Sequence, residues 1–322
     1  MKVAIVYNLP DSKNSADDLD VLVQVEAVQK SLEHLGHNAV SLGVSLNLES
    51  FQKELKKIKP DLVFNLVEAI SGVEMYLHFV PVILEKLNIP FTGASSEALF
   101  TTTNKVFTKK LFDTFSILTP KWETSKNKSS KIKIKTPCII KPIYEDASVG
   151  LDDSSIVYDE EKLSDEFNNR TKKYGECFVE EFIDGREFNI SIMDTEDGVK
   201  VLPIAEIKFV DYPDEKAKIV NYDAKWNENS FEYSHTVRHF EFFSNDKTLL
   251  KELEKVTIRC WEKFNLKGYA RVDFRVDKGN KIYVLEINAN PGIAPDSGFA
   301  AAAERYGWNY NKMVEVILNN VL

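Results

Sequence analysis

The stretch GYARVDFRVDKGNKIYVLEINANPG, residues 268–292, contains two runs of alternating apolar and polar residues separated by Asp277-Lys278-Gly279-Asn280. Alternation with a period of two predicts β-strands, and an Asp, Gly and Asn cluster between them predicts a tight turn. A two-residue turn at Lys278-Gly279 places Arg271 opposite Glu286. The stretch therefore predicts an antiparallel hairpin with charged side chains on one face.

The two faces of this hairpin differ in chemistry. Because side chains alternate, Arg271, Asp273, Glu286 and Asn288 project from the same face. Oxygen-bearing side chains are costly to bury without partners, and hard oxygen ligands are those that Mg²⁺ prefers. The opposite face is apolar and consists of Val272, Phe274, Leu285 and Ile287. The contrast favours a metal site over the alternative, a solvated sheet face with a salt bridge.

The composition limits the classes of protein to which the chain can belong. Its 322 residues are enough for two domains, and 41 Lys plus Arg against 50 Asp plus Glu leave a formal charge of −9. This acidity argues against wrapping duplex DNA, and no apolar run approaches the roughly 20 residues of a membrane span. The three cysteines are far apart, which argues against a disulfide framework and fits a reducing compartment. We expect a cytoplasmic enzyme without a nucleic-acid or membrane partner.

The order of predicted elements changes near residue 94. Before it, strand-like and helix-like runs alternate, which predicts a parallel sheet covered by helices. After it come two helical stretches, a series of short strand-like runs and an Ala-rich helix beyond Phe299, a pattern typical of an α+β domain. We expect domains over 1–93 and 94–322. The elements expected in the first are strands at 2–7, 38–42 and 61–66 and helices at 16–35, 47–59 and 73–87.

The chain lacks the two best-known motifs for nucleotide phosphates. The absence of G-x-G-x-x-G and of G-x-x-x-x-G-K-[ST] argues against Rossmann and P-loop binding. Lys141 instead ends an apolar strand and precedes the small residues of Ala147-Ser148-Val149-Gly150. A lysine and backbone N–H groups in that arrangement can bind a phosphate, although a surface lysine before a proline turn is the simpler alternative.

The segment FVEEFIDGREF, residues 178–188, concentrates acidic side chains in a short apolar run. Such a segment could offer Glu180 to an adenine amino group, the backbone of Glu181 and Ile183 to the ring edge, and Glu187 to ribose hydroxyls. The alternative is a strand pair with a charged outer face. The segment is therefore a candidate for binding the nucleoside part of a nucleotide.

These signals follow an order that resembles the ATP-grasp enzymes and, within them, the D-alanine–D-alanine ligase family. The order is Lys141-Pro142, Glu180-Glu181-Phe182, Glu187, Arg271-x-Asp273 and Glu286-x-Asn288-x-x-Pro291-Gly292. The resemblance extends over essentially the whole chain. It implies an α/β N-terminal domain with a parallel sheet, followed by an α+β ATP-grasp domain of two subdomains, the smaller a lid over about 117–183. It also implies ATP and two Mg²⁺ ions, with Mn²⁺ as an alternative metal.

The family's reaction transfers the γ-phosphate of ATP to a carboxylate, and an amine then attacks the acyl phosphate. Such a reaction needs positioning and neutralisation of charge rather than a nucleophilic side chain. The resemblance implies three catalytic residues. Arg271 stabilises charge at the acyl centre, Lys225 reaches the γ-phosphate, and Ser148 belongs to the loop that closes over the phosphates. By the same resemblance, the residues that contact ATP are Lys105, Lys141, Glu180, Glu181, Ile183 and Glu187. The metal ligands are Asp273, Glu286 and Asn288, with Glu286 bridging the two ions. The carboxylate of the second substrate is bound by Ser297 and Gly298.

The substrate end departs from the family pattern. D-alanine ligases open with a Gly-Gly-x-Ser-x-Glu-type segment, where this chain has LPDSKNSADDLDV (9–21). The family's serine and tyrosine that work with that glutamate are replaced by Ala147 and Trp226, and its His-Gly-x-x-Gly-Glu motif is replaced by residues 68–73. We therefore expect the same chemistry on a different carboxylate. The side chains that could bind its ammonium group are Asp18, Asp20, Glu26 and Glu68.

Three functions compete on these observations. The leading one is an ATP-dependent carboxylate–amine ligase that forms a dipeptide-like amide from small amino acids or peptides and releases ADP and phosphate. The second is a D-alanine–D-alanine ligase with a remodelled first-substrate pocket. The third is a non-catalytic ATP-binding sensor or scaffold, against which the retention of Arg271 and the metal ligands argues. A homodimer is left open.

Overall fold

The computed structural model describes residues 1–10, 16–124, 132–145 and 147–321; for residues 16–18 it describes the backbone. A three-stranded parallel sheet in the order β2-β1-β3 begins the chain, as the alternating pattern predicted. Parallel neighbours need crossover connections, which the intervening helices provide. The elements are β1 (Lys2–Asn8), α1 (Ala16–His34), β2 (Asn38–Val44), α2 (Leu48–Ile58), β3 (Leu62–Asn65), η1 (Glu74–Tyr76) and α3 (Phe79–Leu87).

The helix predicted at 73–87 is divided into η1 and α3. Pro81 has no N–H to donate to the carbonyl four residues earlier, and its ring would collide with that carbonyl in a continuous helix. A proline is tolerated only in the first helical turn, so α3 begins at Phe79 and places Pro81 there. The prediction of one uninterrupted helix was wrong for this reason.

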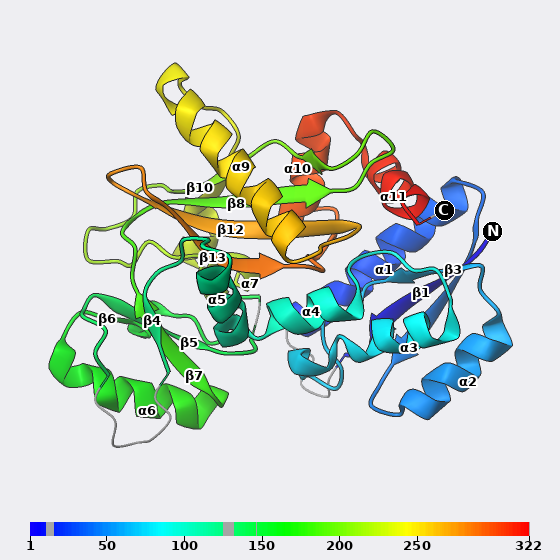
Figure 1. Cartoon of the computed structure of the whole chain (residues 1–322), viewed down its shortest axis with the longest axis horizontal. Coiled ribbons are helices and arrows are strands. Elements are labelled where there is room, and N and C mark those ends of the chain that lie inside the picture. The colour runs from blue at the N-terminus through cyan, green and yellow to red at the C-terminus, as the bar shows by residue number, and fades with distance from the viewer. Residues whose placement is uncertain (11–15, 125–131, 146, 322) are drawn as a thin grey trace.

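The rest of the chain forms two antiparallel sheets with helices (Figure 1). The smaller sheet, in the order β4-β7-β5-β6, and the larger, in the order β11-β10-β8-β12-β13 with β9 beside β8, lie on different sides of a cleft. The strands are β4 (Trp122–Glu123), β5 (Cys138–Pro142), β6 (Ile156–Val157), β7 (Cys177–Glu181), β8 (Gly185–Met193), β9 (Lys200–Val201), β10 (Ala205–Phe209), β11 (Thr236–His239), β12 (Tyr269–Asp277) and β13 (Ile282–Asn288). The α-helices are α4 (Ser96–Thr103), α5 (Lys105–Thr114), α6 (Leu163–Tyr174), α7 (Tyr222–Trp226), α8 (Phe231–His235), α9 (Lys247–Lys263), α10 (Gly298–Tyr306) and α11 (Tyr310–Asn319).

The small sheet has a hydrophobic core of its own on one side. Its hydrophobic core includes Cys138 and Ile140 of β5, Phe167 of α6 and Val179 of β7. A much larger core joins the N-terminal sheet to the large sheet, and α11 packs beside α1 so that the ends of the chain lie close together (Figure 1). A small sheet with its own core fits a lid, although the boundary at 93 and the lid limits of 117 and 183 stay predictions.

The hairpin of β12 and β13 exists, but its register differs from the predicted one. Arg271 pairs with Asn288 and Asp273 with Glu286, so a two-residue turn at Lys278-Gly279 was wrong. The turn is longer because the Asp277 side chain accepts hydrogen bonds from the backbone N–H groups of Gly279 and Lys281. Arg271, Asp273, Glu286 and Asn288 nevertheless share one face, as predicted.

A β-bulge also changes which residue of β13 enters the core. The register shifts between Asp273 and Phe274, which leaves Leu285 without a partner on β12. Val284 is fully buried, whereas Leu285 lines the cleft. The prediction that Leu285 belongs to the apolar face was therefore wrong, since one extra residue moves the following side chains to the other face.

Candidate active site

The cleft has a volume of about 520 Å³ and lies where the small sheet, the large sheet and the N-terminal region meet. It brings together residues from segments that are far apart in the sequence. The residues expected to bind ATP, metal and the second substrate all line it, together with Glu68: Lys105, Lys141, Ser148, Glu180, Glu181, Ile183, Glu187, Lys225, Arg271, Asp273, Glu286, Asn288, Ser297 and Gly298. Their common location is the geometric basis for treating them as one site.

The charged face of the hairpin forms the floor of the cleft. Arg271 donates from Nε and Nη2 to the two carboxylate oxygens of Asp273, both at 2.8 Å. Glu286 lies opposite Asp273, with its carboxylate 3.8 Å from Nζ of Lys105. Burial raises the pKa of Glu286, but the surrounding cations, with Lys105 the strongest, outweigh it and lower the pKa to about 2. Glu286 is therefore ionised at neutral pH.

The oxygen donors of this face fit a divalent cation. Asp273 and Glu286 are a cross-strand pair and Asn288 follows two residues along β13, so their side chains converge on one side of the sheet. Carboxylate and amide oxygens with room for phosphate oxygens are the environment in which Mg²⁺ is commonly bound. Among the described residues, no group of three or more His, Cys, Asp or Glu side chains is arranged to hold a metal ion, here or elsewhere. The proposed set at this face has two carboxylates, and the amide of Asn288 would be its third oxygen donor.

Two of the predicted phosphate lysines are held in position by the chain around them. Lys105 begins α5, whose N-cap Asn104 accepts a hydrogen bond from Phe107 N, and its Nζ donates to the carbonyl of Glu145 at 2.8 Å. Lys141 lies at the end of β5, with Nζ 2.7 Å from a carboxylate oxygen of Glu180. Both ammonium groups therefore point into the cleft from defined backbone positions.

Glu180 occupies a buried ion-pair network that the sequence did not reveal. Its carboxylate lies 2.6 Å from Nζ of Lys109, a fully buried lysine of α5 that also donates to Thr119 Oγ1. Burial raises the pKa of Glu180, but the charges of Lys109 and Lys141 outweigh it and lower the pKa. Glu180 thus fixes the position of Lys141, while its predicted contact with an adenine amino group stays a prediction.

Glu187 has a partner that strand alternation could have identified. Arg275 follows Arg271 and Asp273 at intervals of two along β12, and its Nη2 lies 2.7 Å from the carboxylate of Glu187. The guanidinium also lies over the ring of Phe182, 5.6 Å from its centroid. Burial raises the pKa of Glu187 more than Arg275 lowers it. The pair closes the floor of the cleft beside β7.

The loop before β6 is tied to the segment that carries Lys225. Ser148 Oγ donates to the carbonyl of Val220 at 2.8 Å, and Trp226 Nε1 donates to the carbonyl of Ala147 at 3.0 Å. The two positions that depart from the family's serine and tyrosine, Ala147 and Trp226, therefore contact each other through a different hydrogen bond. The connection holds the loop over the cleft from the side of α7.

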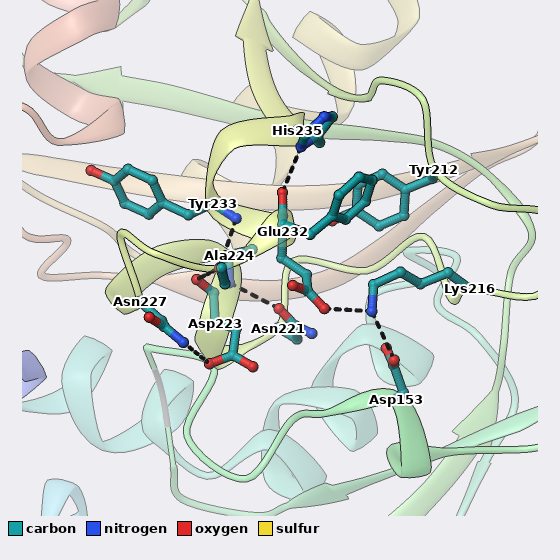
Figure 2. A network of polar contacts seen from close by, with 12 residues as sticks. Asp153, Tyr212, Lys216, Asn221, Asp223, Ala224, Asn227, Glu232, Tyr233 and His235 are labelled. Atoms are coloured by element: carbon teal, nitrogen blue, oxygen red, sulfur yellow. Dashed lines mark hydrogen bonds and ion pairs between the residues drawn. The ribbon is translucent and has the colours of Figure 1, made fainter.

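The segment from 210 to 235 is itself anchored by polar contacts (Figure 2). Lys216 bridges Asp153 of the small sheet's connection, at 3.0 Å, and Glu232 of α8, at 2.5 Å. Asn221 caps α7 by accepting a hydrogen bond from Ala224 N at 2.9 Å. These contacts fix α7, and with it Lys225, relative to the small sheet.

The N-terminal region contributes an acidic pair, Asp20 and Glu68, to the end of the cleft where the first substrate is expected to bind. Gln24 Nε2 donates to Asp20 Oδ2 at 2.8 Å and to Glu68 Oε1 at 2.9 Å, while its Oε1 accepts from the N–H of Ile293. A Cβ at Gly292 would lie 3.2 Å from Gln24 Nε2, so the glycine permits this close approach. Sequence reasoning missed Gln24.

The acidic candidates for an ammonium group separate into two sets. Asp20 and Glu68 line the cleft, and burial raises the pKa of Asp20. Glu26 is exposed and pairs with Lys30 on the surface of α1, so it does not belong to the cleft. The side chain of Asp18 and residues 11–15 of the opening loop lie outside the described residues.

The end of the cleft where the second substrate is expected to bind lies at the start of α10. Ser297 is the N-cap, and its Oγ accepts a hydrogen bond from Ala300 N. Arg238 of β11, which sequence reasoning missed, approaches Gly298: a Cβ at that position would lie 3.6 Å from Arg238 Nη2. Ser297, Gly298 and Arg238 all line the cleft.

Comparison with known proteins defines the class. A family model described as "D-ala D-ala ligase C-terminus" matches residues 112–319. The D-alanine–D-alanine ligase of Aquifex aeolicus is 32% identical over 296 residues, covering 91% of this chain and 92% of that protein. A protein described as "Uncharacterized protein y4sG", from Sinorhizobium fredii, is 29% identical and covers 91% of this chain and 86% of its own length. These similarities and the cleft define an ATP-grasp ligase, an enzyme that forms an amide bond with ATP and a divalent metal ion.

The chain belongs to the D-alanine–D-alanine ligase family. Solved structures show the same fold: the Bacillus anthracis D-alanine–D-alanine ligase complexed with ATP matches with a TM-score of 0.77 at 22% identity, covering 100% of this chain and 97% of that one. The VanG D-Ala:D-Ser ligase of Enterococcus faecalis matches with a TM-score of 0.73 at 17% identity, covering 100% and 99%. The predicted fold class is confirmed. Among the helices that the structure describes, none has the length and apolarity needed to cross a membrane.

Proposed function

We propose that this ligase activates the carboxylate of a substrate other than D-alanine and joins it to an amine that itself carries a free carboxylate. The observation that supports the proposal is a contrast within one cleft. The positions expected to bind ATP and metal are all present, while the first-substrate end has Ala147 bonded to Trp226 and an Asp20–Gln24–Glu68 cluster. The chemistry is thus that of the family, and the pocket is different.

In the proposed reaction an oxygen of the substrate carboxylate attacks the γ-phosphorus of ATP and the bond to the β-phosphate oxygen breaks, leaving ADP and an acyl phosphate. The amine nitrogen then attacks the acyl carbon, phosphate departs, and the nitrogen loses a proton to solvent. Lys105, Lys141 and Lys225 neutralise phosphate charge, and Arg271 stabilises the negative charge that develops at the acyl centre. Asp273, Glu286 and Asn288 would hold two Mg²⁺ ions, which supply Lewis-acid neutralisation of the phosphates when bound.

The nucleoside end follows from the same assignment. The backbone of Glu181 and Ile183, at the edge of the cleft, would contact adenine, and Glu187 would accept from ribose hydroxyls. Ser148, fixed to Val220, would keep the loop closed over the phosphates and exclude water from the acyl phosphate. Asp20 and Glu68 would bind an ammonium group on the first substrate.

A second candidate is the D-alanine–D-alanine ligase reaction itself. It is favoured by the Aquifex relative, which carries that name and covers nearly the full length of both chains. The two candidates differ only in the first-substrate pocket. A pocket whose polar groups are built for another substrate discriminates by factors of roughly 10⁴ when a hydrogen bond goes unmade.

The test is a comparison of specificity constants for ADP release with saturating MgATP and amino acids of both hands, singly and in pairs, with product masses measured. We expect D-alanine to be a poor carboxylate substrate and another amino acid or small peptide to be much faster. If D-alanine plus D-alanine is clearly the best pair, the remodelled pocket serves the plain ligase reaction. The free, buried cysteines fit the reducing cytoplasm in which we expect the enzyme to work. Light scattering would decide between a monomer and a homodimer.

A further inference from the structure

Arg238 is a cation in the cleft to which the reaction above assigns no role. It lies on β11, the edge strand of the large sheet, directly opposite Ile207 of β10. Residues opposite each other in an antiparallel pair share a face, and both of these side chains line the cleft. Arg238 is solvent-accessible and makes no salt bridge with any residue in the described part of the chain. Its guanidinium is therefore available to a ligand.

The surroundings of Arg238 are positive. Its Nη2 would lie 3.6 Å from a Cβ at Gly298, the first residue of α10, where the helix carries partial positive charge. Partial desolvation in the cleft and the like charge of Arg271 lower the pKa of Arg238, and the charge of Asp296 opposes them. Arg271 is neutralised by its two hydrogen bonds to Asp273, whereas Arg238 is not. A bound anion would remove the repulsion.

The network in Figure 2 holds the helix that precedes the strand of Arg238. The helix α8 leads directly into β11, and its Glu232 is held by Lys216 at 2.5 Å. At the start of β11, the hydroxyl of Thr236 is 2.8 Å from that of Tyr212. A strand anchored at its start loses less freedom when a ligand binds to its side chains.

We propose that Arg238 is a specificity residue that binds a carboxylate of the amine substrate. The inference rests on the proposed function and adds to it the chemistry that selects the amine. Two sources present the same group: the α-carboxylate of an amino acid, or an acidic side chain. In both cases the guanidinium donates hydrogen bonds to the carboxylate oxygens at the Gly298 end of the cleft. Amines without a carboxylate bind poorly because the repulsion between Arg238 and Arg271 is then not relieved.

The experiment measures KM for the amine and KM for ATP in the full chain, using the carboxylate that gives the fastest ADP release. The amines are matched pairs of similar shape, glutamate with glutamine, aspartate with asparagine, and alanine with alaninamide, in both hands. The variants are Arg238→Gln, Arg238→Lys and, as control, Arg305→Gln. Arg305 belongs to α10 but pairs with Glu241 away from the cleft. Loss of a charge-assisted contact predicts a rise of about 10- to 100-fold in the KM of the carboxylate-bearing amine.

The result that supports the proposal is a rise in Arg238→Gln confined to the charged member of a pair, partly reversed in Arg238→Lys, with KM for ATP within about twofold and Arg305→Gln like the parent chain. A rise for alanine but not alaninamide identifies the α-carboxylate, and a rise for glutamate but not glutamine identifies the side chain. Equal effects on both members of every pair would overturn the proposal. Trapping with hydroxylamine separates the proposed function from the proposed role of Arg238. If the parent chain forms a hydroxamate, the acyl phosphate is supported even when the Arg238 variants show no selective effect. If no carboxylate gives a hydroxamate, both proposals are overturned.

Discussion

The two ends of the cleft differ in how their charges are satisfied. At the nucleotide end, Glu180 is shared by Lys109 and Lys141, and Glu187 is paired with Arg275, in groups that are almost completely buried. At the substrate end, Asp20 and Glu68 meet through the neutral amide of Gln24, and Arg238 has no salt bridge among the described residues.

This difference reflects what each end must do. A buried charge needs partners that belong to the protein, because leaving one of the pair unmatched costs about 3–5 kcal/mol. The nucleotide end therefore presents a rigid, pre-formed set of charges to a ligand that does not vary. The proposed substrate end presents Arg238, which has no salt bridge among the described residues, so we expect its residues to determine specificity. Changes at the nucleotide end should damage stability or turnover for all substrates, and changes at the substrate end should alter selection.

The largest effect should come from Glu286→Gln. Removing the charge of this proposed metal ligand should lower ADP release by roughly 10³–10⁴-fold, which corresponds to about 4–5.5 kcal/mol of barrier, and Asn288→Ala should act in the same direction. Steady-state ADP assays with Glu304→Gln, an exposed position of α10, provide the control, and thermal unfolding checks that the variants fold. Turnover close to that of the parent chain in both variants would disprove the metal assignment.

The next effect should be on stability, in Lys109→Met. Glu180 would keep Lys141 but lose its fully buried partner, at an expected cost of about 3 kcal/mol at neutral pH in urea unfolding. The adjacent, exposed Lys110→Met is the control. Equal losses of unfolding free energy in the two variants would show that the ion pair between Lys109 and Glu180 does not stabilise the fold.

The same pair predicts a dependence on pH. Because the pKa of Glu180 is lowered from its ordinary value of 4.5, its ionised form stabilises the fold above that pH, and the contribution is lost as the pH falls through the lowered value. The difference in unfolding free energy between the parent chain and Lys109→Met should therefore shrink in acid. A difference that stays constant from pH 7 to about pH 3 would contradict this assignment of charge.

Arg271→Ala should separate binding from chemistry. We expect kcat to fall by roughly 10²-fold while the Kd for ATP changes less than about threefold, since the charge is needed most where negative charge develops. Rapid-quench or steady-state kinetics combined with calorimetric ATP titration measures both quantities. A loss of ATP affinity with an unchanged maximal rate would show that Arg271 stabilises the bound ATP rather than the transition state.

The smallest effect should come from Trp226→Phe, which removes the indole hydrogen bond to the carbonyl of Ala147 while keeping an aromatic ring. One neutral hydrogen bond is worth about 1 kcal/mol, so kcat/KM for the carboxylate substrate should fall by roughly three- to tenfold. Trp308→Phe, whose ring packs on Tyr306 outside the cleft, is the control. An unchanged kcat/KM would show that the loop closes without this bond.

Local patterns in the sequence determined much of the fold and of the nucleotide end. Alternation alone put Arg271, Asp273, Glu286 and Asn288 on one face, because side-chain direction in a strand depends only on parity. The same rule extended to Arg275 would have identified the partner of Glu187. The strand–helix alternation likewise predicted the parallel N-terminal sheet, because parallel neighbours need helical crossovers.

Only the tertiary structure decided the register of the hairpin, the buried network and the substrate end. The bulge at Leu285 depends on which side chain fits the core and which faces the cleft, a choice made by packing against other elements. Lys109 reads as an ordinary helical lysine until Glu180 is placed beside it, and Gln24 meets residues 68 and 293 only when the sheets assemble. Arg238 reaches α10 across about 60 residues of chain. Specificity is built from such long-range contacts, whose partners are not neighbours in sequence and leave no local pattern.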